Sequence, residues 1–159
     1  MNRSELVARV EADHGAWGAI IDQAGGRVDE PGAAGEWTLR DVLAHINAYH
    51  RFVIGNLGGD VRGFDAMPDD IGFDVQKRNE WMHAQDLGMS WADVLAEHDS
   101  LFGQLLEQVG RRTDEQLQQK MVDWAPETIE EWVLNLTDGH FKEHEPDLRA
   151  WLTGPGTRG

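Results

Sequence analysis

Apolar residues recur at every third or fourth position along most of this 159-residue chain, and no long stretch alternates apolar with polar residues. The first pattern places apolar side chains on one face of an α-helix, whereas strict alternation is typical of a half-buried strand. The sequence therefore predicts an all-α protein. The composition does not change along the chain, so we expect a single domain that spans residues 1–159.

Local start and stop signals divide this pattern into four main helical segments. Thr38 and Asp41 form a capping box at the start of the second segment, and Ser90 can cap the stronger part of the third. Pro146 lies inside the last segment and removes one backbone donor there. The expected segments are 3–24, a second from the Thr38 cap to near Gly58, a third split into 73–86 and 90–109, and a fourth over 127–152.

Residues 58–72, GGDVRGFDAMPDDIG, are long for a loop within a compact domain. A connection of this length can run along a helical bundle and join two parallel neighbours. Together with the four helical segments, it predicts a four-helix bundle with a long crossover between the second and third helices.

The charge balance narrows the range of partners. The chain carries 29 acidic and 14 basic residues, which gives a formal net charge of −15. A surface this acidic repels phosphate backbones and anionic membranes, so we expect neither nucleic acid nor a membrane as a partner. The first residues lack the apolar core of a signal peptide, and no apolar run approaches the ~20 residues of a membrane span. These features predict a cytoplasmic protein.

The chain has no cysteine, so a transition-metal site in it would have to use histidine and carboxylate ligands. The segment DGHFKEHEPDLRAWL places His140 and His144 one helical turn apart, on the same inward stripe as Leu136 and Leu148. Two imidazoles in these positions can bind one ion. The alternative is that they are hydrogen-bonded polar residues of an ordinary helix core, which is the commoner role of a single histidine.

A third ligand should come from another helix, and three histidines qualify. His45 and His50 both lie on the apolar arc of the second segment, and His98 shares a face of the third with Val94 and Leu101. Periodicity does not choose among them. A site with three histidine ligands and open positions would be of the catalytic kind, because closed structural zinc sites use four protein ligands.

Two stretches resemble the DinB-like superfamily, which includes the YfiT-type metalloenzymes and the mycothiol-dependent maleylpyruvate isomerases. They are PGAAGEWTLRDVLAHINAYH, which contains His45, and GHFKEHEPDLRAWL near the end. In both stretches the chain is most similar to the ClbS/DfsB-like branch. The resemblance covers most of the chain and implies a four-helix bundle in up-down-down-up order. It also implies that His45, His140 and His144 bind a divalent metal, zinc or nickel.

The resemblance implies two alternative functions. In the first, the metal serves an enzyme that acts on a small electrophilic molecule, as a hydrolase or as a thiol-dependent transferase or isomerase. An external low-molecular-weight thiol would then be a further cofactor, because the chain has no cysteine. In the second, the protein is a metal-independent, ClbS-like protective hydrolase or a small-molecule binding module of the stress response. Seven tryptophans are available to line a pocket in either case.

The sequence leaves open whether several other residues take part in the site. Trp37 and Tyr49 can line a pocket near the histidines, although filling the core is the commoner role of such aromatics. Glu143 and Glu145 flank His144 and should point into solvent. A homodimer formed through helix faces is a further expectation about partners.

Overall fold

Most helices begin where a polar side chain can satisfy the unpaired amides of the first turn. In the computed structural model the described residues are 1–63, 68, 70–71 and 74–154. Thr38 Oγ1 accepts a hydrogen bond from the Asp41 amide at 3.1 Å, while the Thr38 amide donates to Asp41 Oδ2 at 3.0 Å. Ser90 Oγ likewise accepts from the Asp93 amide at 3.1 Å. The caps predicted for the second and third segments are therefore confirmed.

The described residues form helices and turns and contain no β-strand, which confirms the predicted all-α class. A 3₁₀ turn, η1, covers Gly25–Arg27, and a π-helical turn, η3, covers Asn135–Gly139. None of the helices in these residues is long and apolar enough to cross a membrane. The α-helices are α1 (Arg3–Ala24), α2 (Leu39–Asn56), α3 (Val75–Asp86), α4 (Trp91–Gly110), α5 (Asp114–Leu117), α6 (Ile129–Leu134) and α7 (His140–Thr153).

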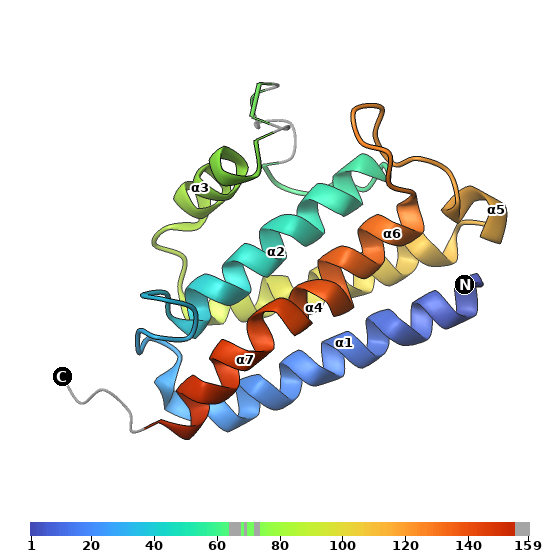
Figure 1. Cartoon of the computed structure of the whole chain (residues 1–159). Helices are drawn as coiled ribbons and strands as arrows, with labels where there is room; N and C mark the ends of the chain where they lie inside the picture. The colour runs from blue at the N-terminus through green and yellow to red at the C-terminus, as the bar shows by residue number, and fades with distance from the viewer. Residues whose placement is uncertain (64–67, 69, 72–73, 155–159) are drawn as a thin grey trace.

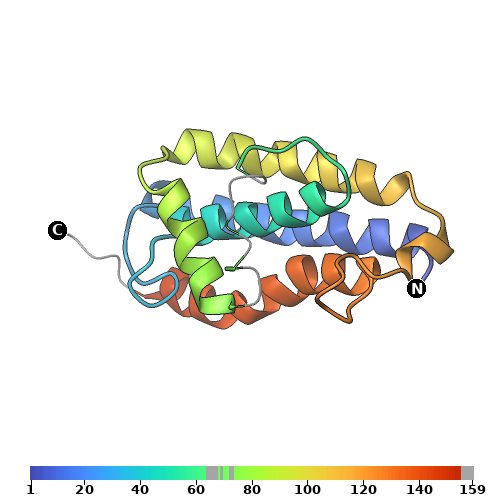
Figure 2. The same ribbon diagram turned by 90° about the horizontal axis from the view of Figure 1, so that it is seen from above.

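The long helical segments lie side by side: α1, α2, α4 and the run of α6, η3 and α7 (Figure 1). α2 packs against α4, and α1 packs against α4 as well as against α6, η3 and α7. The view from above shows α3 lying across α2, with which it is in contact (Figure 2). The apolar core fills the space between these segments, with Trp17, Phe102 and Leu148 among its most buried members.

α2 is covered on all sides by other parts of the molecule, including α3, α4 and the π turn. Every residue from Val42 to Ile54 is buried, including the polar side chains of His45, Asn47 and His50. The sequence indicated only one apolar arc for this helix. The outer side is also buried because α3 packs on it. The direction in which an α2 side chain points therefore decides its role, since exposure is low everywhere along it.

The prediction of one continuous helix over 127–152 is wrong in one respect. α6 ends at Leu134, the π turn follows, and α7 starts at His140. A π turn holds one extra residue and so rotates every side chain that comes after it. As a result Leu136, which regular helical spacing places on the inward stripe, is only half-buried, and Thr137 is buried in its place.

The predicted crossover falls in the connection between α2 and α3. Of the expected loop over 58–72, residues 64–67, 69 and 72 lie outside the described residues. The third segment is split as predicted, because α3 and α4 are separate helices with Gly88 between them. Gly88 has a φ of 88°, a left-handed conformation that glycine adopts without steric cost.

Candidate metal centre

Three histidines from two helices converge in the structure. His45 of α2 faces His140 and His144 of α7, and one ring nitrogen from each lies within 4.8 Å of the others. His45 Nε2 and His140 Nε2 are 3.1 Å apart. The ring centroids of His144 lie 5.9 Å from His45 and 5.0 Å from His140. The structure thus brings together the three residues that the resemblance indicated.

The local sequence of the last helical run places two of them. The π turn ends at Gly139, so His140 is the first residue of α7, and His144 follows one turn later on the same face. π turns are frequent at functional sites. Pro146 lies inside α7 as predicted, and the helix continues past it to Thr153. The extra residue of the π turn therefore sets the direction in which both histidines point.

The three imidazoles are neutral at pH 7. Burial, with a smaller contribution from neighbouring imidazoles, lowers the pKa of His45 to about 4 and the pKa of His140 to about 2. Burial also lowers the pKa of His144, although Glu143 and Asp147 oppose the shift. A metal ion binds neutral imidazole, because the lone pair of the unprotonated nitrogen is the ligand. The ring environment therefore favours the form that can bind a cation.

The Nε2 atoms of His45 and His140 are placed to bind a divalent cation, but their Nδ1 atoms lack the usual supporting hydrogen bonds in the part of the chain that the structure describes. His45 Nε2 and His140 Nε2 face each other at a hydrogen-bond distance, so one must donate a proton to the other unless both face a cation. Imidazole nitrogen suits zinc and nickel alike. The Nδ1 atoms of both rings are buried, and neither has a hydrogen-bond partner within the described residues. The outer hydrogen bonds that usually orient metal-binding histidines are thus not supplied by that part of the chain.

An open cleft of about 440 Å³ reaches the histidines. Its walls come from α2, α3, the π turn, α7 and the segment before α2, and they include Trp37, Tyr49, Arg78 and Asn79. The Tyr49 hydroxyl donates to Asn79 Oδ1 and accepts a hydrogen bond from Arg78 Nε at 3.4 Å. The Tyr49 ring also packs edge-on against His45 and His140, with centroids 5.0 and 5.3 Å apart. Trp37 and Tyr49 therefore line the cleft and do more than fill the core.

Sequence reasoning missed Arg78 and Asn79. Both belong to α3, whose sequence VQKRNEWMHAQD has little apolar character and predicted no site. They reach the cleft because α3 packs on α2, a tertiary contact that leaves no local signal. Glu143 is exposed as expected, but it also lines the cleft. Glu145 is half-buried and accepts a hydrogen bond from Arg149 Nε at 2.8 Å.

The sequence profile of the DinB superfamily matches residues 26–140, which is more than half of the chain. The chain belongs to the DinB superfamily. The matched range contains His45 and ends at His140, so His144 and most of α7 lie beyond it. The superfamily indicated by the two motifs is confirmed, and the ClbS/DfsB-like branch stays a prediction.

Two crystal structures have the same fold as this DinB-superfamily chain. An uncharacterised protein from Escherichia coli UTI89 is 12% identical, and the match covers 94% of this chain and 92% of that chain with a TM-score of 0.75. A protein from Streptococcus pneumoniae is 15% identical, with 95% of this chain and 90% of that chain covered and a TM-score of 0.73. At these identities the likeness shows the fold alone. A search of curated protein sequences finds no match.

His50 and His98, the other two candidates for the third ligand, lie apart from this group. His50 is fully buried, and neither of its ring nitrogens has a hydrogen-bond partner in the described residues. Its ring packs edge-on against Phe102 at a centroid distance of 4.8 Å, with His98 at 6.5 Å. Burial, together with nearby His98, lowers the pKa of His50 to about 3, and the nearby Leu136 backbone opposes this shift only in part. In this DinB-superfamily protein His50 is a neutral core residue.

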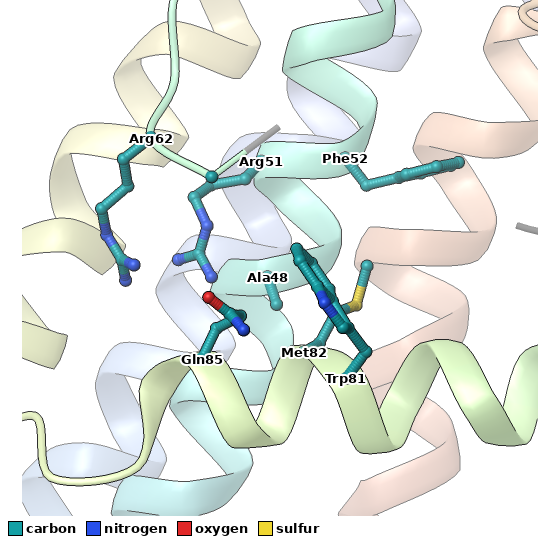
Figure 3. A pocket seen from close by; sticks show the side chains of 8 residues that line it. Ala48, Arg51, Phe52, Arg62, Trp81, Met82 and Gln85 are labelled. Atoms are coloured by element: carbon teal, nitrogen blue, oxygen red, sulfur yellow. The ribbon is translucent and has the colours of Figure 1, made fainter. Parts of the chain in front are cut away.

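A second, narrower pocket between α2 and α3 holds only about 40 Å³. Arg51 and Arg62 lie on one side of it and Trp81 on the other (Figure 3). Both arginines are already paired: Arg51 Nη2 is 2.8 Å from an Asp86 oxygen, and Arg62 Nε is 2.6 Å from a Glu97 oxygen. Two positive and two negative side chains balance here, so the arginines offer no uncompensated charge to a ligand.

Proposed function

We propose that this chain is a metal-dependent enzyme that acts on a small electrophilic molecule. A zinc or nickel ion would be held by His45, His140 and His144, with positions left open for water or substrate. The observation that carries the proposal is the convergence of three neutral imidazoles, from two helices, at the wall of a cleft. The cleft volume of about 440 Å³ lies within the range of about 300 to 1,000 Å³ that is common for small-molecule sites.

Bound there, a divalent ion supplies a Lewis acid and can keep water or an external thiol deprotonated near neutral pH. The protein's own side chains would hold the substrate. The Tyr49 hydroxyl, between Asn79 and Arg78, can hydrogen-bond to a polar substrate atom. Trp37, stacked on His83 at 4.9 Å, offers a flat apolar surface. These features suit hydrolysis, or a thiol-dependent transfer or isomerisation in which the thiol comes from outside the chain.

The proposal extends to the architecture that carries the site. We take α1, α2, α4 and the run of α6, η3 and α7 as a four-helix bundle in up-down-down-up order, formed by one domain over residues 1–159. The contacts of α1 with α4 and α7, and of α2 with α4, support this order. The two crystal structures support it as well, because they match 94% and 95% of the chain. A homodimer and a cytoplasmic location stay predictions, and the net charge of −15 argues against nucleic acid as a partner.

One observation favours a metal-independent protein instead. The 3.1 Å between the two Nε2 atoms of His45 and His140 is a normal hydrogen-bond distance, so this pair is satisfied without an ion. The protein would then be a ClbS-like protective hydrolase or a small-molecule binding module of the stress response. The same cleft would bind its ligand.

Metal content separates the two candidates. After incubation with zinc or nickel and dialysis, elemental mass spectrometry should find one equivalent less metal in His140→Ala than in the wild type. His50→Leu, a change at a buried histidine outside the group, should hold as much metal as the wild type and serves as the matched control. Equal metal content in the wild type and His140→Ala would sink the metalloenzyme proposal and leave the metal-independent one.

A further inference from the structure

A second group of metal-ligand side chains lies between α1 and α4. His14 of α1 and His98 and Asp99 of α4 each offer one ligand atom, and these atoms lie within 4.8 Å of one another. None of the three lines the cleft at His45. Because α1 and α4 pack against each other, an ion bound at this point would join the two helices.

His98 has the arrangement of an oriented metal ligand. Its Nδ1 is 3.2 Å from Asn47 Oδ1, and Asn47 Nδ2 donates to the Val94 carbonyl at 3.0 Å. Since the amide nitrogen of Asn47 is used there, its oxygen faces His98, and Nδ1 of His98 is the protonated nitrogen. Nε2 then carries the lone pair. The residue is only 1% exposed, and Nε2 has no hydrogen-bond partner in the described part of the chain.

This outer hydrogen bond distinguishes His98 from the histidines at the cleft. A metal-binding histidine almost always donates its second ring N–H to a carbonyl, a carboxylate or water, which fixes the tautomer and the ring orientation. His98 has such an acceptor in Asn47. The Nδ1 atoms of His45 and His140 have none within the described residues. By this criterion the group at His98 is the better prepared of the two.

His14 and Asp99 complete the set from the solvent side. His14 Nε2 is 3.0 Å from Asp99 Oδ1, and the two side chains are 40% and 63% exposed. The His14 ring stacks on Phe102 at a centroid distance of 4.3 Å, and its centroid is 5.4 Å from that of His98. The stacking holds His14 beside His98, and the exposed carboxylate of Asp99 can turn toward an ion that enters from water.

We propose that His14, His98 and Asp99 form a second metal site, with a donor set that binds zinc, and that an ion held there clamps α1 to α4. Two histidines and one carboxylate are an established donor set for zinc, with water in the remaining position. The net charge of −15 favours cation binding in general. His14 lies outside the matched residues 26–140, whereas His98 and Asp99 lie inside them. The site shares no residue with the group at His45, so it does not depend on the proposed function.

The test first disables the histidine group at the cleft, so that any remaining zinc binding reports on the group between α1 and α4. Full-length protein that carries His140→Ala and His144→Ala is titrated with zinc, and the stoichiometry and Kd are measured by equilibrium dialysis. We expect one zinc per chain. Adding Asp99→Asn or His14→Gln should raise the Kd at least about tenfold. Asp22→Asn, the same charge change at an exposed position of α1 outside the group, should leave the Kd unchanged.

The zinc stoichiometry and Kd decide whether the second site exists. Absence of zinc binding in the doubly substituted protein, or the same Kd with and without Asp99→Asn, would overturn the second site. Asp99 is exposed and His14 is half-buried, so these substitutions spare the core and the variants should fold. Two zinc ions in the wild type and one in the doubly substituted protein support both sites. One zinc ion in the wild type and one in the doubly substituted protein would support the site between α1 and α4 and count against the site at the cleft.

Discussion

His45 and His50 lie five residues apart on α2 and resemble each other in burial and charge. They are 7% and 0% exposed, and burial lowers their pKa values to about 4 and about 3. They differ in what they face. His45 faces His140 at the wall of the cleft, whereas His50 packs against Phe102 in the closed core.

The difference shows that a low pKa does not identify a metal ligand. Burial alone disfavours the charged imidazole, so any core histidine that stays unpaired acquires a low pKa. What sets His45 apart is the convergence of several lone pairs at a space that solvent can reach.

The largest effect on metal binding is expected from His45→Ala. It removes one of the three proposed ligands. Loss of a group that only hydrogen-bonds to a ligand typically lowers metal affinity by about 10- to 100-fold. Loss of a ligand itself should therefore lower the affinity for zinc at the cleft by more than about a hundredfold. His50→Leu should leave the affinity unchanged. Competition with a chromophoric chelator measures both, in an Asp99→Asn background so that the site between α1 and α4 contributes less. Retention of zinc by His45→Ala together with its loss in His50→Leu would reverse the roles of the two residues.

The all-α class and two of the three histidines of the cleft site could be predicted from the sequence, because their signals are local. Thr38 and Ser90 start helices by reaching amides only three residues away, and His140 and His144 share a face because they are one turn apart. His45 could not be chosen over His50 from periodicity, because α2 is buried on all sides and its apolar arc has no single direction. That choice came from the resemblance to the DinB-like superfamily.

The π turn and the far wall of the cleft could not be predicted from the sequence. The stretch Asn135–Gly139 contains no residue type that requires a π turn, and regular helical spacing fits it almost as well. Arg78 and Asn79 enter the cleft because α3 packs on α2, after a connection whose path no local pattern specifies. Tertiary packing, more than propensity, decides both features.

Asp13 of α1 is an acidic counterpart of His50, a buried side chain whose oxygens have no hydrogen-bond partner in the described residues. Burial, with repulsion from Asp138, raises its pKa from 3.8 to about 7. Between these values the folded state holds a proton that the unfolded state releases. The stability that depends on this proton is present below pH 3.8 and is lost as the pH rises through about 7.

Asp13→Asn should therefore raise the free energy of unfolding in mildly alkaline buffer, by up to roughly 4 kcal/mol, and change it little near pH 4. Urea denaturation at the two pH values measures the difference, and Asp22→Asn controls for the lost negative charge at an exposed position. An equal gain at both pH values would mean that the folded protein does not hold Asp13 protonated.

His50→Leu should show the opposite dependence on pH. The folded pKa of about 3 lies below the ordinary value of 6.5, so the unfolded state takes up a proton first as the pH falls. The stability that depends on neutral His50 is present above pH 6.5 and is lost as the pH falls toward 3. The variant should resist acid better, by roughly 3 kcal/mol near pH 4. The acid midpoint of tryptophan fluorescence measures it, and an unchanged midpoint would contradict a buried, neutral His50.

The smallest effect is expected from Tyr49→Phe, which asks whether the cleft wall beside His45 serves the metal or the substrate. The hydroxyl bonds to Asn79 and Arg78 of α3, so its loss should lower the free energy of unfolding by about 1 kcal/mol. The ring remains, and its edge contacts with His45 and His140 need no hydroxyl. Zinc affinity should therefore stay the same while turnover of a cleft substrate falls. A parallel fall in zinc affinity would instead make the hydroxyl part of the support for the histidines, and this wall of the cleft would then belong to the metal site itself.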